Sequence, residues 1–399
     1  MTGSRADCPD RMRRRILPSC VLLVFLLGAA GCATRGPAPD FQRAIRAADE
    51  DGHYLADLPL YPVSDSEGHA AVLAMVTDYW EPPGLLARLR PRWRAHRVGA
   101  IRPDDALETY LVERGLWGYW GVGEMDTLKE RLRADAPVLV SMQERPFDRT
   151  DLALALVAGY DDARERILLY GLADEPVQKS YDDFLRSWRY AQERYLVVSP
   201  PERADWRLTV SERISRGRHH MAVQRYADAE PDFVAALEMD PGVARHYVEL
   251  ADAHALREQY GEAEPLYRAA LRLDDTDARA MNNLAHVLIY SDGDLAEAKR
   301  WARRATALEP DNPRLLHTLG VALYRADAYR EAARMLERAR TRAMNMDGAT
   351  QAEIAMKLVQ VYHDDDLWHL ARQTLADALA HDPDVDVPEP LRIHLRDEP

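Results

Sequence analysis

The sequence predicts two parts of different fold class: an α+β domain in the first half and an all-α solenoid of repeated helix pairs in the second. The second half repeats with a period close to 34 residues, which is typical of stacked helix pairs. The first half has no such period, and its strand-like runs come after its helices, which indicates α+β rather than α/β. A chain of 399 residues is also long enough for two or three domains with separate cores.

Composition and charge narrow the class of partner. Lys and Arg total 52 and Asp and Glu total 66, for a net charge of −14. Nucleic-acid binding needs a basic surface, so this balance argues against nucleic acid as the main partner. A local basic stretch runs from Arg88 to Arg97, and it suits an anionic lipid surface, an acidic partner or a solvated arm.

The first 31 residues are typical of a secretory signal peptide. A basic segment, residues 11–15, precedes an apolar run from Ile16 to Ala30 that is short for a membrane span of about 20 residues. The run ends in Ala-Ala-Gly-Cys at Cys32, which resembles the lipobox of bacterial lipoproteins. The resemblance implies cleavage before Cys32 and lipidation of its thiol. The alternative is an ordinary cleaved signal peptide with a chance cysteine, and the true start is either Met1 or Met12.

Cleavage before Cys32 would change both the charge and the cysteine content. It removes five arginines and two aspartates, so the net charge becomes −17. It also removes Cys8 and Cys20, so the mature chain keeps one cysteine and has no internal disulfide. Ala33 is not the Asp that retains lipoproteins in the inner membrane, so the resemblance implies an outer-membrane anchor facing the periplasm. We expect residues 32–54 to be a tether.

The elements of the first domain follow from hydrophobic pattern and turn residues. Helices are expected at Glu67–Trp80, Asp104–Gly115 and Asp126–Ala134, and strands at 137–142, 152–157, 167–170 and 195–198. Gly159–Asp162 is predicted to be the turn between two strands, and Gly121-Val122-Gly123 a turn beside core aromatic residues. Residues 199–208, which contain two adjacent prolines, are expected to link the two domains.

Three landmarks within residues 55–200 carry a resemblance to a known family. Leu-Pro-Leu-Tyr-Pro at 58–62 precedes a helix with Leu-Ala-Met-Val at 73–76; an apolar strand ends in Gly-Tyr-Asp at 159–161; and a further strand covers 167–171. In this order they resemble the papain-like domain of bacteriocin-processing, double-glycine-leader cysteine peptidases, in lipoprotein versions fused to helical repeats. The resemblance implies a papain-like fold.

The catalytic positions that the resemblance implies hold no catalytic residues. A cysteine peptidase needs a thiolate at a helix N-terminus, a His that activates it and a third group that orients the His. Here these positions hold Glu67 or Gly68, then Ala153, then Gly171. We therefore expect a non-catalytic domain. The alternative is an active peptidase or acyl-transfer enzyme with a non-cysteine nucleophile, either Ser66 or a displaced residue.

The alternative enzyme has its own candidate residues. Ser64 and Ser66 lie near the nucleophile position, and His69 with Glu67 or Asp65 would supply a base, although a surface or helix-capping role suits His69 better. The adjacent His219 and His220 do not share a helix face, so metal binding there is not expected. The acidic run after His363 suits either a weak cation site or, more simply, a solvated turn between two helices. No metal and no cofactor is expected.

Five units build the predicted solenoid over residues 209–385. Small residues recur at Ala229, Ala263, Ala298, Ala332 and Ala371, with spacings of 34, 35, 34 and 39, and each is followed by another alanine seven residues later. The pattern resembles tetratricopeptide repeats, in which small residues let paired helices approach and Pro or Asp ends the second helix. Extra residues near 341–350 are expected to form a longer turn at Gly348, and residues 386–399 a C-terminal tail.

The first helices of such repeats line a groove, and the resemblance places seven residues of this chain in it. They are Arg218, Asn282, His286, Tyr290, His317, Tyr324 and Arg325. Donors mixed with aromatic rings suit an extended peptide or an acidic tail. The sequence thus predicts a lipid-anchored envelope adaptor that binds a protein or peptide in this groove.

Overall fold

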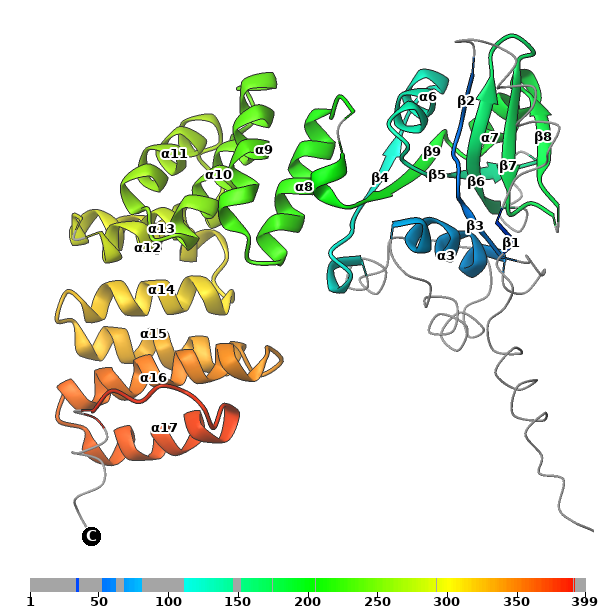
Figure 1. Ribbon diagram of the computed structural model, residues 1–399. Helices are drawn as coiled ribbons and strands as arrows, with labels where there is room; N and C mark the ends of the chain where they lie inside the picture. Colours follow the sequence, from blue (N-terminus) through cyan, green and yellow to red (C-terminus); the bar gives the residue numbers. More distant parts are fainter. Residues whose placement is uncertain are drawn as a thin grey trace, which may run out of the picture. The chain divides into compact units, whose positions relative to one another are not determined.

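The computed structural model describes residues 34–35, 52–61, 68–80, 111–145, 152–173, 175–204, 206–291, 293–389 and 391. The chain divides into two compact units, Met1–Trp206 and Arg207–Pro399, and each is described by itself (Figure 1). The predicted signal peptide, Cys32, Ser64, Ser66, Glu67 and the basic stretch at 88–97 lie outside the described residues, as does most of the helix predicted at 104–115.

A seven-stranded antiparallel sheet forms the first unit. Its strand order is β4-β9-β5-β6-β7-β8, and β2 pairs with β6. The strands are β2 (Gly52–Tyr54), β4 (Trp117–Val122), β5 (Val138–Gln143), β6 (Leu152–Asp161), β7 (Arg166–Tyr170), β8 (Val177–Ser180) and β9 (Arg194–Ser199). A separate two-stranded pair joins β1 (Thr34–Arg35) to β3 (Pro59–Leu60). All residues of β5 are buried, which places it in the core of the unit.

Three helices with bounds within the described residues accompany the sheet, and residues 111–113, which belong to the helix predicted at 104–115, are helical as well. Helix α3 (Gly68–Trp80) contacts β5, β6 and β9, and its residues from Ala71 to Thr77 are buried. Helix α6 (Met125–Arg133) contacts β5 and β6. Helix α7 (Tyr181–Tyr190) begins after Ser180, whose hydroxyl accepts a hydrogen bond from the Asp183 amide at 3.2 Å. The helices predicted at 67–80 and 126–134 therefore lie where they were expected.

Two predicted turns of the first unit are strands instead. Gly121 and Val122 end β4, and Gly159 to Asp161 belong to β6, whose turn follows at residues 162–165. Both glycines sit where the chain passes close to a neighbour. A Cβ on Gly159 would lie 2.7 Å from the His53 carbonyl oxygen, and one on Gly121 would lie 2.6 Å from the Tyr195 ring. These glycines therefore allow close packing and do not mark turns.

Described residues of the predicted tether and linker make contacts within the first unit. Within residues 32–54, Thr34 pairs with Leu60 and Tyr54 pairs with Gly159, so the folded part begins before residue 55. Within residues 199–208, a short 3-10 turn covers Pro201–Arg203, and the ring of Trp206 stacks on that of Trp117 with centroids 6.2 Å apart. Pairings of two or three residues and one aromatic anchor leave little pattern in a sequence.

Ten helices form the second unit in the described residues, arranged as five pairs (Figure 1). They are α8 (Val210–Ala222), α9 (Tyr226–Met239), α10 (Ala244–Leu256), α11 (Tyr260–Leu273), α12 (Ala278–Tyr290), α13 (Leu295–Leu308), α14 (Pro313–Tyr324), α15 (Tyr329–Arg342), α16 (Gly348–Asp364) and α17 (Trp368–His381). Every alanine that defined the repeat lies in the second helix of a pair and is fully buried. The predicted all-α solenoid of repeated helix pairs is therefore present.

Close helix contact explains why small residues recur in this unit. A Cβ on Gly320 would lie 2.6 Å from Leu336 Cγ, and one on Gly217 would lie 2.4 Å from the Phe233 ring. The prediction for the longest spacing was wrong in one respect, because Gly348 begins α16 and does not form a longer turn. Asp347 caps that helix, its side chain accepting from the Thr350 amide at 2.9 Å. Part of the insertion therefore lengthens a helix.

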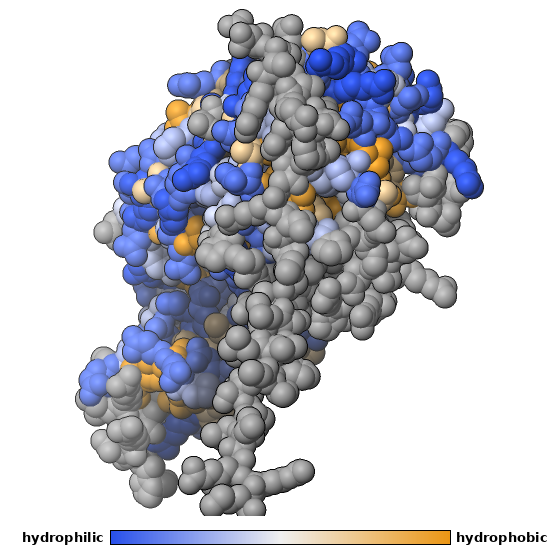
Figure 2. Space-filling view, turned by 45° about the vertical axis from the view of Figure 1, so that its right-hand side comes forward, coloured by the Kyte–Doolittle hydropathy of each residue, from blue (hydrophilic) through white to orange (hydrophobic). Residues whose placement is uncertain are grey.

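On the face shown in Figure 2, the visible described residues are mostly hydrophilic, and hydrophobic residues appear in separate patches. Scattered patches of this kind are ordinary for a folded domain. No helix among the described residues is long and apolar enough to cross a bilayer. The same residues contain no group of three or more side chains that would hold a metal ion.

Candidate functional site

The first helices of the five pairs form one surface. Helices α8, α10, α12, α14 and α16 each contact the first helix of the adjacent unit. Side chains at equivalent positions recur along it, as Arg218, Asp252 and His286 do at intervals of 34 residues. We call this row of side chains the first-helix surface. Six of the seven predicted groove residues lie on its helices. The seventh, Arg325, is the C-cap residue of α14.

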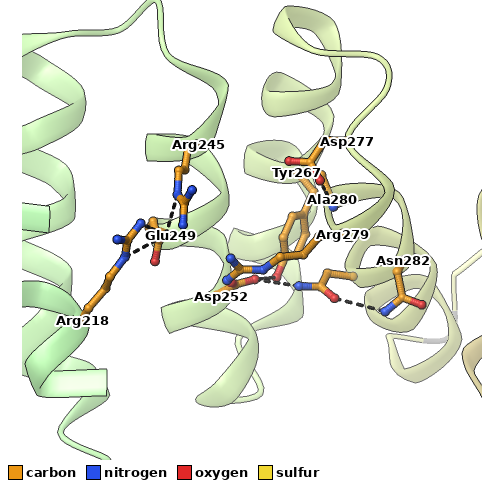
Figure 3. A network of polar contacts seen from close by, with 10 residues as sticks. Arg218, Arg245, Glu249, Asp252, Tyr267, Asp277, Arg279, Ala280 and Asn282 are labelled. Atoms are coloured by element: carbon orange, nitrogen blue, oxygen red, sulfur yellow. Dashed lines mark hydrogen bonds and ion pairs between the residues drawn. The ribbon is translucent and has the colours of Figure 1, made fainter. Parts of the chain in front are cut away.

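The part of this surface on α8, α10 and α12 is a closed polar network (Figure 3). Arg218 binds Glu249 at 2.6 Å between Nη2 and Oε1, and Arg245 approaches the same oxygen at 3.4 Å. The carboxylate of Asp252 accepts from the Tyr267 hydroxyl at 2.5 Å, from Asn283 Nδ2 at 2.8 Å and from Arg279. Because each charge here has a partner, the network holds neighbouring units in register.

Burial controls the electrostatics of Asp252. The residue is 8% exposed, and this burial raises the pKa of its carboxyl, although Arg279 and the Tyr267 hydroxyl act in the opposite direction. Burial, and after it the contact with Asp252, raises the pKa of the Tyr267 hydroxyl. The hydroxyl therefore stays protonated and donates to the carboxylate.

Farther along α12, polar atoms have fewer hydrogen-bond partners than in this network. Asn282 Nδ2 donates to Asn283 Oδ1 at 3.2 Å, but Asn282 Oδ1 is buried and has no hydrogen-bond partner among the described residues. The ring of His286 lies 4.5 Å from that of Tyr290, which lies 6.5 Å from the ring of Tyr260. Tyr290 is 39% exposed. The result is an aromatic strip beside an unused acceptor.

Helices α14 and α16 add charged groups to this strip. The Nε2 atom of His317 is buried and has no hydrogen-bond partner in the described part of the chain. Burial and the neighbouring Lys357 lower the pKa of His317 to about 4, so its ring is neutral at physiological pH. Burial also lowers the pKa of Lys357. Tyr324 points to Asp364, to which its hydroxyl donates at 2.6 Å.

The structure brings some of the predicted residues together and separates others. Four of them lie in the part of the surface on α12 and α14 where buried polar atoms lack hydrogen-bond partners among the described residues, which we call the unsatisfied region: Asn282, His286, Tyr290 and His317. Arg218 instead forms an ion pair with Glu249. Sequence reasoning missed Glu249, Asp252, Arg279, Glu353 and Lys357. A signal for one of them was present, because Asp252 lies midway between Arg218 and His286 at the same position of the repeat.

The peptidase-like positions lie in the first unit and show no nucleophile–base pair among the described residues. Gly68 is the first residue of α3, and Ala153 pairs with Met142 within the sheet. Gly171 adopts φ +100°, and a Cβ at this position would lie 2.3 Å from Val72 Cγ2 of α3. The space for a larger side chain at residue 171 is therefore filled by α3.

Comparisons with known proteins identify the repeats. The family model described as tetratricopeptide repeat matches residues 214–278 and 257–313, so the helix pairs of the second unit include tetratricopeptide repeats. No curated protein matched the chain. Repeats of this kind act as protein-binding scaffolds through extended surfaces of stacked helices.

Several solved structures are similar to about half of the chain. YrrB, a TPR protein with an unusual peptide-binding site, is 20% identical over 47% of this chain and 91% of its own, with a TM-score of 0.37. The pilF protein of Pseudomonas aeruginosa is 21% identical over 46% and 80%, with a TM-score of 0.40. Cut9 with Hcn1 of the APC/C is 17% identical over 47%, with a TM-score of 0.42, and the match spans 36% of that chain.

Proposed function

We propose that this protein is a scaffold that binds a protein or peptide through the first-helix surface of its repeats. The observation that carries the proposal is the unsatisfied region on α12 and α14. Buried polar atoms in folded proteins nearly always have hydrogen-bond partners, yet Asn282 Oδ1 and His317 Nε2 have none in the described residues. Asn282 lies on α12 with the exposed Tyr290, and His317 lies on the adjacent first helix α14, so a chain bound across both helices would satisfy these atoms and cover the ring.

A pair of substitutions tests this function. Tyr290→Ala combined with Arg325→Ala removes an aromatic anchor and a cation from the surface without touching the buried core, so recovery of the partner from envelope extract should fall at least tenfold. The matched control is Leu308→Ala combined with Arg304→Ala on α13, whose side chains are also exposed. Equal recovery by the two variants would refute the proposed surface.

We propose further that Cys32 is lipidated and holds the protein in the outer membrane, facing the periplasm. The support is the basic segment, the short apolar run and the Ala-Ala-Gly-Cys ending. Cys32→Ser should move the protein from the membrane fraction to the soluble fraction, because one thiol carries the whole anchor. Continued attachment to the membrane would contradict this assignment.

The first unit is, in this proposal, a non-catalytic papain-like domain. Its antiparallel sheet with α3 against β5, β6 and β9 is compatible with that fold, and the family's positions hold Ala153 and Gly171. A serine-directed covalent reagent should therefore fail to label the chain. Labelling that disappears in a Ser64, Ser66 and His69 triple alanine variant would establish the enzymatic alternative.

A further inference from the structure

Strand β4 is an edge of the sheet in the first unit, and it lacks the features that protect sheet edges from pairing with other chains. Its six residues, Trp117–Val122, include no charged residue and no proline. The other edges are shorter and charged: β8 has four residues and carries Lys179, and β2 has three, with His53 bound to Asp135 at 3.0 Å. Among the described residues, β4 is therefore the long, uncharged edge that can accept another strand.

The hydrogen-bond register of β4 identifies the backbone groups on its free side. The strand pairs with β9 in one continuous antiparallel register, and just beyond its end the Gly123 amide donates to the Glu193 carbonyl oxygen at 3.2 Å. Residues of a strand alternate between bonding to one neighbour and to the other, so the odd-numbered residues of β4 bond to β9. Gly118, Trp120 and Val122 therefore direct their amides and carbonyls outward, and no described residue is bonded to them.

The side chains of these outward residues leave room for a neighbouring strand. Gly118 has no side chain, and Val122 is 69% exposed. The ring of Trp120 is partly buried, with the Arg194 guanidinium 5.4 Å from its centroid. Its indole Nε1 is buried and has no hydrogen-bond partner among the described residues. The β4 edge thus presents backbone donors, backbone acceptors and an unused indole donor together.

We propose that two copies of this chain pair through β4, antiparallel and centred on Trp120, so that their sheets join into one. Outward-directed residues must form the hydrogen-bonded pairs of such a ladder, and paired residues lie on the same face of the sheet. A centre at Trp120 pairs this residue with its own copy and pairs Gly118 with Val122 twice, which makes about six backbone hydrogen bonds. A centre at Tyr119 would leave Val122 without a partner in β4.

The sequence around Trp120 selects a second copy as the occupant. In this register the bulky residues Trp117, Tyr119 and Val122 each lie opposite a glycine of the other copy, at positions 123, 121 and 118 respectively. Every bulky side chain therefore meets a residue that has none, and the two Trp120 residues meet at the twofold axis. No like charges oppose each other, because β4 has no charged residue. A strand of unrelated sequence would not account for this complementarity about one residue.

Sedimentation equilibrium of the full chain in a mild detergent tests the pairing. The wild type should show a monomer–dimer equilibrium that depends on concentration. Val122→Pro removes an outward amide and leaves every amide that bonds to β9, so it should raise the Kd of the dimer about tenfold or more. Val122→Thr is the matched control, because it keeps the amide and the branched shape, and its Kd should stay within about twofold of the wild type. Circular dichroism of each variant confirms that it folds.

Cysteine pairing tests the register. The background is the full chain with Cys8, Cys20 and Cys32 changed to serine. A cysteine at residue 120 would lie directly opposite its copy, with Cα atoms about 5.5 Å apart, which is within reach of a disulfide. A cysteine at residue 122 would lie about 14 Å from its copy, because four residues of strand separate them along the ladder. Mild oxidation should therefore link Trp120→Cys into dimers and should leave Val122→Cys unlinked.

Three results would overturn the inference: a wild type that is monomeric at every concentration, equal Kd values for Val122→Pro and Val122→Thr, or disulfide linkage at residue 122 in place of residue 120. A monomeric chain that captures a different protein through a cysteine at residue 120 would assign the edge to a foreign strand, and it would also overturn the pairing of copies. None of these results bears on the proposed scaffold function, because β4 belongs to the first unit and the first-helix surface to the second.

Discussion

Asp252 offers the strongest quantitative test of how neighbouring repeats are joined. Asp252→Ala removes the acceptor for the buried Tyr267 hydroxyl and for Asn283, and the ion-pair partner of Arg279. An unsatisfied buried hydroxyl costs about 1–3 kcal/mol, and the lost bond to Asn283 about 1 kcal/mol. Arg279 is half exposed, so its ion pair adds little. The expected loss is about 2–4 kcal/mol of unfolding free energy.

Two further variants separate the hydrogen bonds from the charge. Asp252→Asn keeps an acceptor for Tyr267 and removes a buried charge, so its stability at neutral pH should lie within about 1 kcal/mol of the wild type. Tyr267→Phe in the Asp252→Ala background removes the orphaned hydroxyl and should restore about 1 kcal/mol. Urea denaturation followed by helical circular dichroism measures all of these free energies.

The pH dependence has a definite sign. Burial raises the pKa of Asp252 in the folded state, so its favourable contribution is complete at pH values below its ordinary pKa and declines as the pH rises through the folded value. The stability of the wild type relative to Asp252→Asn should therefore be greatest in acid and smaller at neutral pH. Two results would refute the reasoning. One is that Asp252→Ala lowers the unfolding free energy by less than about 1 kcal/mol; the other is that the stability of the wild type relative to Asp252→Asn increases as the pH rises.

Two other substitutions probe different parts of the chain. Glu297 accepts from Arg268 and Trp301, and these bonds lower its pKa to about 2; Glu297→Gln should cost about 1–2 kcal/mol at neutral pH, and in pH-dependent denaturation this cost should fade as the pH falls from about 4.5 toward 2. A cost that does not depend on pH would contradict this. Gly171→Ala combines φ +100° with a Cβ 2.3 Å from Val72 Cγ2, so it should lower stability by about 2–4 kcal/mol in thermal denaturation. Val72→Ala in the same chain should recover part of that loss, and no recovery would mean that Val72 does not fill this space.

The solenoid was predictable because its physical requirement repeats. Each second helix must pack closely against a first helix, so a small residue such as Ala229 or Ala298 is needed once per unit, and the interval is visible in the sequence. The first unit repeats nothing. Its central strands were still predictable from their apolar runs, but β4 reads Trp-Gly-Tyr-Trp-Gly-Val and has no such pattern. Its residues are held by pairing with β9, which is distant in sequence.

The sequence could predict which helices carry the candidate residues, but not which of these residues have ion-pair or hydrogen-bond partners. The repeat register placed Arg218 and His317 on the first helices correctly. It could not show that Arg218 is neutralised by Glu249, which comes from the next unit, or that Nε2 of His317 lacks a hydrogen-bond partner in the described residues. Whether a polar side chain is paired depends on residues about one repeat away in the sequence. The predicted set contained donors and aromatic residues only, so it left out the carboxylates that pair with the donors.

Photo-cross-linking at two positions tests the central claim most directly. A photoreactive residue replaces Tyr290 on the first-helix surface in one chain and Leu308, an exposed residue near the end of α13, in another. In living cells, the chain with the probe at residue 290 should cross-link to a partner protein, and the chain with the probe at residue 308 should not. The same partner captured equally from both positions, or from residue 308 alone, would contradict binding on the first-helix surface.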